Sequence, residues 1–249
     1  MGMLVAWRKQ DATSWLRQLR IPAAIAVVLG IVIPALVYGR MSLLLFVGCA
    51  SAVWIFAVAL LPIIRSLRRE KGAAGITRAA LGMSVAHIGM ALFVIGVTVV
   101  SAFGVETDRS LARGQSIEVA GYEFRMSELR QNVEGPNYTA IEAKFDIHKD
   151  GRYVATVSPQ KRRYLSQQNL MTEAGIRAGL DKDLFVALGD PLGNNAWSVR
   201  VQYKPLIRLI WLGALVMAFG GLIAVSDRRY RVSVREKAAA ADKTAEATA

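Results

Sequence analysis

Hydrophobic residues along this chain gather into four long runs instead of spreading evenly. The runs cover residues 21–38, 41–64, 79–104 and 205–226. An α-helix rises about 1.5 Å per residue, so a run of about 20 apolar residues crosses the ~30 Å hydrocarbon core of a bilayer. The pattern therefore predicts an α-helical membrane protein with four transmembrane helices. Only Gly39 and Arg40 separate the first two runs, which predicts a tight helical hairpin.

Between the third and fourth runs the period changes from helical to alternating. Apolar and polar residues alternate in five segments, which is typical of short strands: residues 115–129, 138–149, 153–159, 183–189 and 196–203. Turn-forming residues separate them, for example Ala120-Gly121 and Asp150-Gly151. The sequence therefore predicts a β-rich domain over residues 105–204, shaped as a small barrel or sandwich and inserted between spans three and four.

The charge of the chain changes this picture only through its placement. The chain is 53% hydrophobic with a net charge of +12, and a strongly basic chain could bind nucleic acid. The basic excess, however, lies in residues 1–20, in 65–78 and after Asp227, beside the apolar runs. Residues 105–204 carry 14 bases and 13 acids and are nearly neutral. We therefore expect a membrane protein that binds no nucleic acid.

The same basic clusters predict the orientation, because short cytoplasmic segments are enriched in Lys and Arg. Four spans place all three clusters on one side, so residues 1–104 should hold a cytoplasmic N-terminus and three spans. Residues 105–204 then lie outside the cytoplasm, and the fourth span is 205–226. The tail, residues 227–249, is poor in bulky side chains and is expected to be cytoplasmic and disordered.

One histidine lies inside a predicted span. His87 is eight residues into the third run, and ionisable residues at such depth usually face a bundle interior, a partner or a cofactor. At 100° per residue four nearby side chains share its face: Met83, Ser84, Met90 and Ala91. That face could receive a flat macrocycle bound through iron. An interhelical hydrogen bond from the imidazole is the competing interpretation.

Three other features of the residue inventory narrow the chemistry. Gly82, Gly89 and Gly96 recur every seven residues on the face opposite His87, which predicts close approach of another helix. Cys49 is the single cysteine, so no internal disulfide and no Cys-x-x-Cys-His haem attachment site exist. His148 ends a predicted strand beside a turn, where an exposed structural histidine is the simpler interpretation.

The outer domain contains one local basic patch. It consists of four consecutive residues: Lys161, Arg162, Arg163 and Tyr164. Charged residues commonly protect a solvated strand edge, so the patch has a structural interpretation. The functional alternative is a docking surface for an anionic partner or for haem propionates. No nucleophile–base set or phosphate-binding loop accompanies it, and catalytic residues stay unassigned.

Several motifs in order resemble one known family. They are SVAHIGMALFVIGV, YEF with GPNYTA, PQKRRYLSQQNLMTEAGI, DLFVALGD and AWSVRVQYKPLIRLIWLGALVMAFGGLIAVSDRRYR. Together, from about Trp7 to Arg235, they resemble the C-terminal portion of the CcmF family, haem lyase components of cytochrome c maturation. The resemblance implies that His87 is an axial ligand of a transmembrane b-type haem. The haem iron would be the only metal that His87 binds. The resemblance also implies that Pro159–Tyr164 lies in a periplasmic domain between the last two spans.

The resemblance further implies partners. They are the remaining N-terminal portion of a CcmF-like protein, the haem chaperone CcmE, a CcmH-type protein and apocytochrome c, all at the bacterial inner membrane. The family's tryptophan-rich segment, its flanking histidines and the second haem-ligating histidine have no counterpart in this sequence. Haem attachment is therefore expected of an assembly, a holocytochrome c synthase, and not of this chain alone. A non-catalytic scaffold or transport accessory, with a structural His87, stays open as the alternative.

Overall fold

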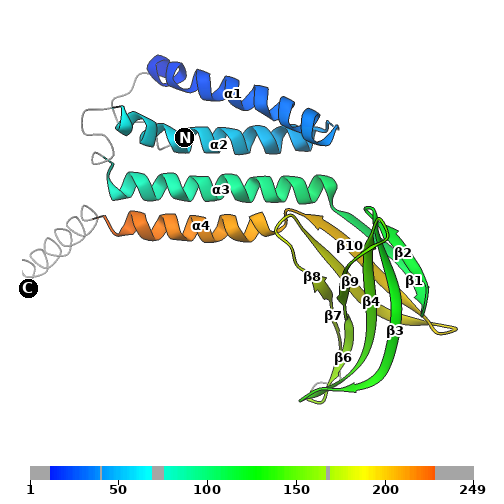
Figure 1. Ribbon diagram of the computed structural model, residues 1–249. Coiled ribbons are helices and arrows are strands. Elements are labelled where there is room, and N and C mark those ends of the chain that lie inside the picture. Colours follow the sequence, from blue (N-terminus) through cyan, green and yellow to red (C-terminus); the bar gives the residue numbers. More distant parts are fainter. Residues whose placement is uncertain (1–11, 40, 69–75, 167–168, 228–249) are drawn as a thin grey trace, which may run out of the picture. The chain divides into compact units, whose positions relative to one another are not determined.

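The computed structural model describes residues 12–39, 41–68, 76–166 and 169–227, which fall into two compact units (Figure 1). One unit is helical and lies within residues 1–98 and 209–249. The other, Val99–Arg208, is built mainly of strands. The C-terminal tail for which disorder is expected lies outside the described residues.

Four helices are long and apolar enough to cross a membrane, as predicted. They are α1 (Ala12–Tyr38), α2 (Leu43–Leu67), α3 (Arg78–Phe103) and α4 (Arg208–Val225). Ser42 precedes α2 and caps it, because its Oγ accepts a hydrogen bond from the Leu45 amide at 3.2 Å. Such a cap satisfies one of the amides that the first helical turn leaves without a partner.

Small residues allow the helices to approach at backbone distance. A Cβ atom added at Gly89 of α3 would lie 2.6 Å from the Met217 amide nitrogen and 2.7 Å from the Gly213 oxygen, both of α4. Gly82 meets Gly220 in the same way, and Gly96 lies against the first turn of α4, at Leu209 and Ile210. The predicted close approach at the glycine stripe is therefore present. Side chains larger than hydrogen would separate the two helices.

The second unit contains ten strands in two antiparallel sheets. One sheet has the order β1-β10-β9-β8; the other has the order β2-β3-β4-β6-β7, with β5 also paired to β4. The strands are β1 (Val105–Ala112), β2 (Ser116–Val119), β3 (Tyr122–Glu134), β4 (Tyr138–Lys149), β5 (Arg152–Val157), β6 (Gln160–Tyr164), β7 (Leu170–Glu173), β8 (Gly175–Arg177), β9 (Lys182–Gly193) and β10 (Ala196–Pro205). The sheets curve around a shared interior, which makes a curled sandwich (Figure 1).

The interior of this sandwich is filled by alternate residues of the long strands. Phe124, Phe145 and Val199 are fully buried, and each is followed two positions along its strand by another buried side chain. Their neighbours in sequence point outward and are mostly polar. Tyr122 of one sheet stacks on Tyr203 of the other, with 6.1 Å between ring centroids. The alternation that predicted the strands is therefore also what fills the core.

All five alternating segments form strands, and the expected turns lie between them. Ala120 and Asp150 adopt positive φ values of 52° and 49°, each followed by a glycine that also has positive φ. Four strands were not expected: β1, β6, β7 and β8. The interpretation of the 161–164 patch as a strand edge is wrong in one respect, because β6 lies between β4 and β7 and the edge strand is β7.

Candidate functional site

His87 lies near the middle of α3 with its imidazole half-buried. Its Nδ1–H donates a hydrogen bond to the Met83 carbonyl oxygen, one helical turn earlier, with 2.8 Å between the atoms. Among the described residues this is the one hydrogen bond of the His87 side chain, and both of its atoms belong to α3. A side-chain bond to a neighbouring helix, the competing interpretation of His87, is not among the contacts of the described residues.

This hydrogen bond determines the chemistry of the ring. A carbonyl oxygen only accepts hydrogen bonds, so the proton must reside on Nδ1. In a neutral imidazole with a proton on Nδ1, the lone pair is on Nε2. Histidine ligands of metals are commonly fixed in this way, with one ring nitrogen bonded to a carbonyl and the other facing the metal. His87 thus presents a single, oriented donor nitrogen.

The four side chains predicted on the His87 face divide into two pairs. Met83 and Met90 are 38% and 41% exposed, and they lie on the same open side of α3. Ser84 and Ala91 are buried, on a stripe that continues to Thr98, which lies against Gly48 of α2. His87 falls between the open side and the buried stripe. The helix therefore offers an apolar open surface beside the imidazole.

Ser84 is unusual among the buried residues. Ser84 Oγ is fully buried. Among the buried side-chain polar atoms of the described residues, it is the one without a hydrogen-bond partner. A serine inside a helix can usually bond to the carbonyl four residues earlier, as Thr98 does to Val94 at 2.7 Å. Most buried hydroxyls have a partner, so Ser84 is an exception, and it lies on the buried stripe of α3 and not on its open side.

An acidic residue that sequence reasoning missed holds the start of α3. The Ala79 amide donates to Asp227 Oδ2 at 2.9 Å, and Asp227 is buried just after α4. A carboxylate at a helix N-terminus satisfies a free amide and interacts favourably with the helix dipole. No local pattern predicts this cap, because the two residues are 148 positions apart. With the glycine contacts, it fixes α3 to α4 on the side away from His87.

Strand alternation splits the basic patch of β6 into two faces. Arg162 lies over the Tyr138 ring, 4.4 Å from its centroid, and its Nε donates to Gln160 Oε1 at 2.8 Å. A hydrogen bond to the Tyr164 side chain raises the pKa of Arg162 above its ordinary value. Tyr164 packs edge-on against Tyr138. This face of the patch is therefore structural.

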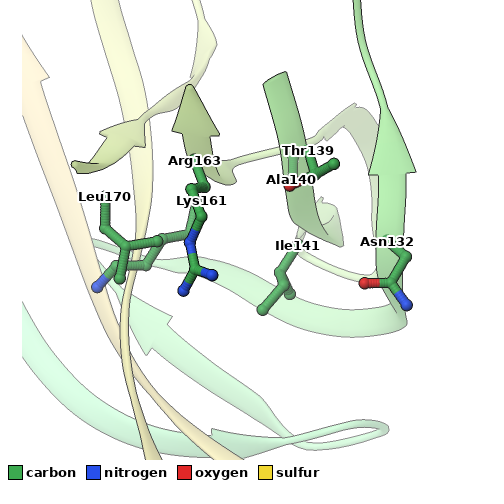
Figure 2. A pocket seen from close by; sticks show the side chains of 7 residues that line it. All are labelled: Asn132, Thr139, Ala140, Ile141, Lys161, Arg163 and Leu170. Atoms are coloured by element: carbon green, nitrogen blue, oxygen red, sulfur yellow. The ribbon is translucent and has the colours of Figure 1, made fainter. Parts of the chain in front are cut away.

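The other face of β6 lines a hollow of about 170 Å³ (Figure 2). Its walls come from four strands, β3, β4, β6 and β7: Asn132, Thr139, Ala140, Ile141, Lys161, Arg163 and Leu170. Lys161 forms an ion pair with Asp190 of β9. Arg163 is exposed, and no ion pair involves it among the described residues. The hollow thus combines apolar walls with one cation that is available to a partner.

Comparison with known proteins identifies a matching family and several relatives of this chain. The family described as the CcmF C-terminal beta-sandwich matches residues 102–205. The cytochrome c-type biogenesis protein CcmF of Pseudomonas fluorescens is 39% identical over 240 residues, covering 95% of this chain and 36% of the relative. The protein of the same name from Escherichia coli K12 is 35% identical over 235 residues, covering 94% of this chain and 36% of the relative. The chain corresponds to the C-terminal portion of the CcmF family. This confirms the resemblance drawn from the sequence motifs.

A solved structure titled cytochrome c haem lyase CcmF has the same fold. It superposes with a TM-score of 0.72 at 22% identity, covering 90% of this chain and 37% of that chain. Four apolar helices and a curled β-sandwich are therefore the architecture of the C-terminal portion of CcmF. The chain spans a little over a third of the length of these relatives.

This CcmF-type chain brings a single histidine to its helical unit. His148, the other histidine of the sequence, ends β4, and its ring lies edge-on against Tyr153 with 5.8 Å between centroids. Among the described residues no three His, Cys, Asp or Glu side chains converge as a metal cluster would require. Within the helical unit a second histidine ligand for an iron bound at His87 is not supplied by this sequence.

Proposed function

We propose that this chain supplies the C-terminal membrane and sandwich portion of a CcmF-like haem lyase assembly in cytochrome c maturation. The relatives that cover 95% and 94% of its length are named cytochrome c-type biogenesis proteins. In this proposal the assembly binds haem and attaches it covalently to apocytochrome c. The chain contributes one haem ligand and one docking domain, and the remaining portion of a CcmF-like protein contributes the rest.

His87 is the proposed axial ligand of a b-type haem, and the Met83 hydrogen bond is the main support. That bond leaves Nε2 with the lone pair, on a side of α3 where Met83 and Met90 are partly exposed. Met side chains adapt to flat or irregular apolar surfaces, which a macrocycle presents. Bound haem would supply one-electron chemistry there.

The site has only half of a bis-histidine ligand set. A second histidine would come from the N-terminal portion of a CcmF-like protein, so the haem would lie between the two portions. One imidazole in an incomplete bundle should hold haem weakly. The open side of α3 and the need for a second ligand therefore point to the same missing partner.

The hollow beside β6 is the proposed docking place for the soluble partners. Arg163 extends from this face of the strand without an ion pair among the described residues, while Lys161 is held by Asp190. An exposed cation over apolar walls fits an acidic segment of apocytochrome c, CcmE or a CcmH-type protein. Arg162 and Tyr164 support the strand from the opposite face.

The proposed location is the bacterial inner membrane with the sandwich in the periplasm. Its support is the placement of the basic clusters in the sequence: a four-span topology puts all three on one side of the membrane and residues 105–204 on the other. Reporter fusions within residues 120–195 should give a periplasmic signal, and fusions after Gly75 or Glu236 a cytoplasmic one. A cytoplasmic signal from a fusion at residue 150 would reverse the orientation.

The haem assignment is tested by absorption spectroscopy of the reconstituted assembly. Purified alone, the chain should carry little haem. Co-expressed with the N-terminal portion of a CcmF-like protein, it should give the low-spin b-type spectrum with a narrow α band in the reduced form. His87→Ala should lose this spectrum without loss of membrane insertion, since it removes a polar group from a span.

Two further variants make the outcome specific. His87→Gly should regain a low-spin spectrum when imidazole is added, because the free ligand can replace the missing side chain. His148→Ala should leave the spectrum unchanged, because that ring packs on Tyr153 in the sandwich. Retention of the full low-spin spectrum in His87→Ala would disprove the ligand assignment and favour a scaffold with a structural His87.

A further inference from the structure

The end of the sandwich nearest the membrane is fixed by chain connection. Gly104 alone separates α3 from β1, and only Leu206 and Ile207 separate β10 from α4. Val105, at the start of β1, pairs with Tyr203 near the end of β10. Each extended residue spans at most ~3.6 Å, so this end of the two strands lies within a few ångströms of two membrane-spanning helices.

The loop between β8 and β9 is bonded to this same end. The Leu206 amide, just before α4, donates to the Asp181 carbonyl oxygen at 2.8 Å. The carboxylate of Asp183 is buried and accepts from the Gly179 amide at 2.9 Å and from Arg208 Nε at 3.2 Å. The loop of residues 178–181 is therefore held, from both of its ends, against the residues where α4 begins.

At the tip of this loop Leu180 is 89% exposed, the highest value for a large apolar side chain among the described residues. It contacts nothing that would hide it, although the loop around it is firmly bonded. A single exposed leucine is common on protein surfaces, so the exposure of Leu180 gains meaning only from the position of its loop. A membrane surface would lie within a few residues of this loop, because the loop is bonded to the start of α4, a candidate membrane span.

Four basic residues lie at this end of the sandwich, although Lys182 is largely buried beside Tyr122 and Lys204 lies over the Phe185 ring. Arg177 ends β8, Lys182 begins β9, Lys204 is near the end of β10, and Arg208 begins α4. Two carboxylates accompany these four cations. Asp181 pairs with Lys182, and its pKa is lowered by that hydrogen bond; Asp183 pairs with Arg208. Positive charge therefore remains in excess at this end of the sandwich.

We propose that the loop of residues 178–181 contacts the membrane surface. Leu180 enters the boundary between headgroups and acyl chains, and the cations at this end of the sandwich bind the phosphates of anionic lipids. An apolar tip at the same end as Lys and Arg side chains matches the chemistry of this boundary, where long basic side chains extend to the phosphate level. The contact ties the sandwich to the bilayer at a third point, besides its two chain connections.

The test uses an environment-sensitive fluorophore on the full chain. In a Cys49→Ala background, which removes the single cysteine, L180C and L192C are labelled with nitrobenzoxadiazole. The chains are reconstituted in nanodiscs of phosphatidylcholine and phosphatidylglycerol, with or without lipids that carry a shallow nitroxide. The label at 180 should emit at shorter wavelength and be quenched several-fold more by the nitroxide than the label at 192.

Leu192 is a matched control. It is also an exposed leucine, 59% exposed, but it belongs to β9 and lies near the far end of that strand. Ten strand residues of ~3.3 Å each separate it from Lys182 at the membrane end. Equal quenching at 180 and 192 would overturn the proposal. A blue shift at 180 without nitroxide quenching would also overturn it, because the leucine would then be covered by protein.

The role of the cations has its own measurement. Quenching at 180 should be stronger with phosphatidylglycerol present than in phosphatidylcholine alone, and added salt should reduce the difference. Arg177→Gln with Lys204→Gln should reduce that difference, since neither side chain has an ion pair to a carboxylate among the described residues, although Lys204 lies over the Phe185 ring. Equal quenching in both lipids for the unsubstituted cations would disprove the headgroup contact.

Discussion

The two units of this chain differ in the size of the side chains that they bury: the sandwich buries large ones, and the helical unit buries many small ones. In the sandwich the fully buried residues include Phe124, Phe145 and Met126, while its surface is charged. In the helical unit glycine and alanine occupy many of the buried positions, and large side chains such as Trp211 and Leu215 are about 70% exposed. Water drives large apolar groups inward, whereas lipid does not. The same chain therefore follows two packing rules.

This difference explains where each unit places its functional groups. The sandwich has a complete core and can present Arg163 and Leu180 on a rigid surface. Among the described residues the helical unit has a much smaller core cluster, formed by Leu19 and Val58, and many of its apolar side chains are exposed. His87 lies beside one of these exposed apolar surfaces. In the proposed assembly this surface is where His87 would contribute one ligand of a shared set.

The largest expected effect comes from emptying the sandwich core. Phe145→Ala removes a fully buried ring from β4 and leaves a cavity, which should lower the free energy of unfolding by about 3–5 kcal/mol. Denaturant unfolding of the full chain, followed by β-type circular dichroism, measures this loss. Leu192→Ala is the control and should stay within ~0.5 kcal/mol, because that side chain is exposed. A loss at Phe145 no larger than at Leu192 would contradict the assigned core.

The corresponding change in the helical unit adds an atom instead of removing several. Gly89→Ala places a Cβ atom 2.6 Å from the Met217 amide nitrogen, so α3 and α4 must separate, at a cost of about 1–3 kcal/mol. Gly221→Ala, on α4, meets nothing within 4 Å and should be neutral or stabilising, because alanine is the better helix former. Thermal unfolding in one detergent compares them.

The sign of the effect decides this comparison. Helix propensity alone would make both alanine variants more stable, by up to about 1 kcal/mol. Opposite signs at positions 89 and 221 would therefore isolate the packing contribution. If Gly89→Ala were as stable as Gly221→Ala, the backbone contact between α3 and α4 would be wrong, and with it the fixed position of His87.

Sequence alone predicted the elements that carry a strong period. The four spans and the five alternating strands follow from hydrophobicity, because lipid and the sandwich core each demand it. The strand β1 reads VETDRSLA and is exposed along most of its length, so it has little alternation. The strand β6 reads QKRRY and is stabilised by ring stacking and ion pairs instead of apolar burial. Neither feature has a periodic signal.

The candidate site around His87 could be predicted from the sequence only in part, as the secondary-structure elements could. An ionisable residue within a span singles out His87, and its ring can reach the carbonyl of Met83 because four residues make about one helical turn. The exposed state of Met90 and the burial of Ser84 depend on which helices pack against α3. Asp227 depends on the same packing. These are tertiary facts that an isolated helix does not encode.

A smaller effect separates the two faces of β6. Arg162→Gln removes the contact with the Tyr138 ring and the ion pair to Glu173 at 3.5 Å, so it should cost about 1 kcal/mol of stability. Arg163→Gln should change stability by less than ~0.5 kcal/mol and should instead weaken binding of an acidic partner peptide. Unfolding and peptide-binding titrations on both variants give the two numbers. Equal stability losses would show that both arginines are structural.

The smallest expected effect lies on the outer surface of β3. Arg130 and Lys144 lie 2.6 and 2.8 Å from the Glu128 carboxylate and lower its pKa to about 2. In the unfolded chain a glutamate has a pKa of about 4.3. Because the folded pKa is the lower one, the pairing stabilises the fold above about pH 4.3. That contribution is lost as the pH falls towards 2.

Glu128→Gln should remove the pH-dependent contribution of this carboxylate to the stability of the sandwich and leave the rest of that stability unchanged. At low salt the unfolding midpoint of the unsubstituted chain should fall more steeply than that of Glu128→Gln between pH 5 and pH 2, and at high salt the two curves should approach each other. The Glu128 side chain is 36% exposed at the surface, so solvent and salt screen the interaction and the difference should be small. Curves that coincide at low salt would mean that these surface pairs add nothing to the sandwich. Its stability would then reside in its apolar core, which is the property that separates it from the helical unit.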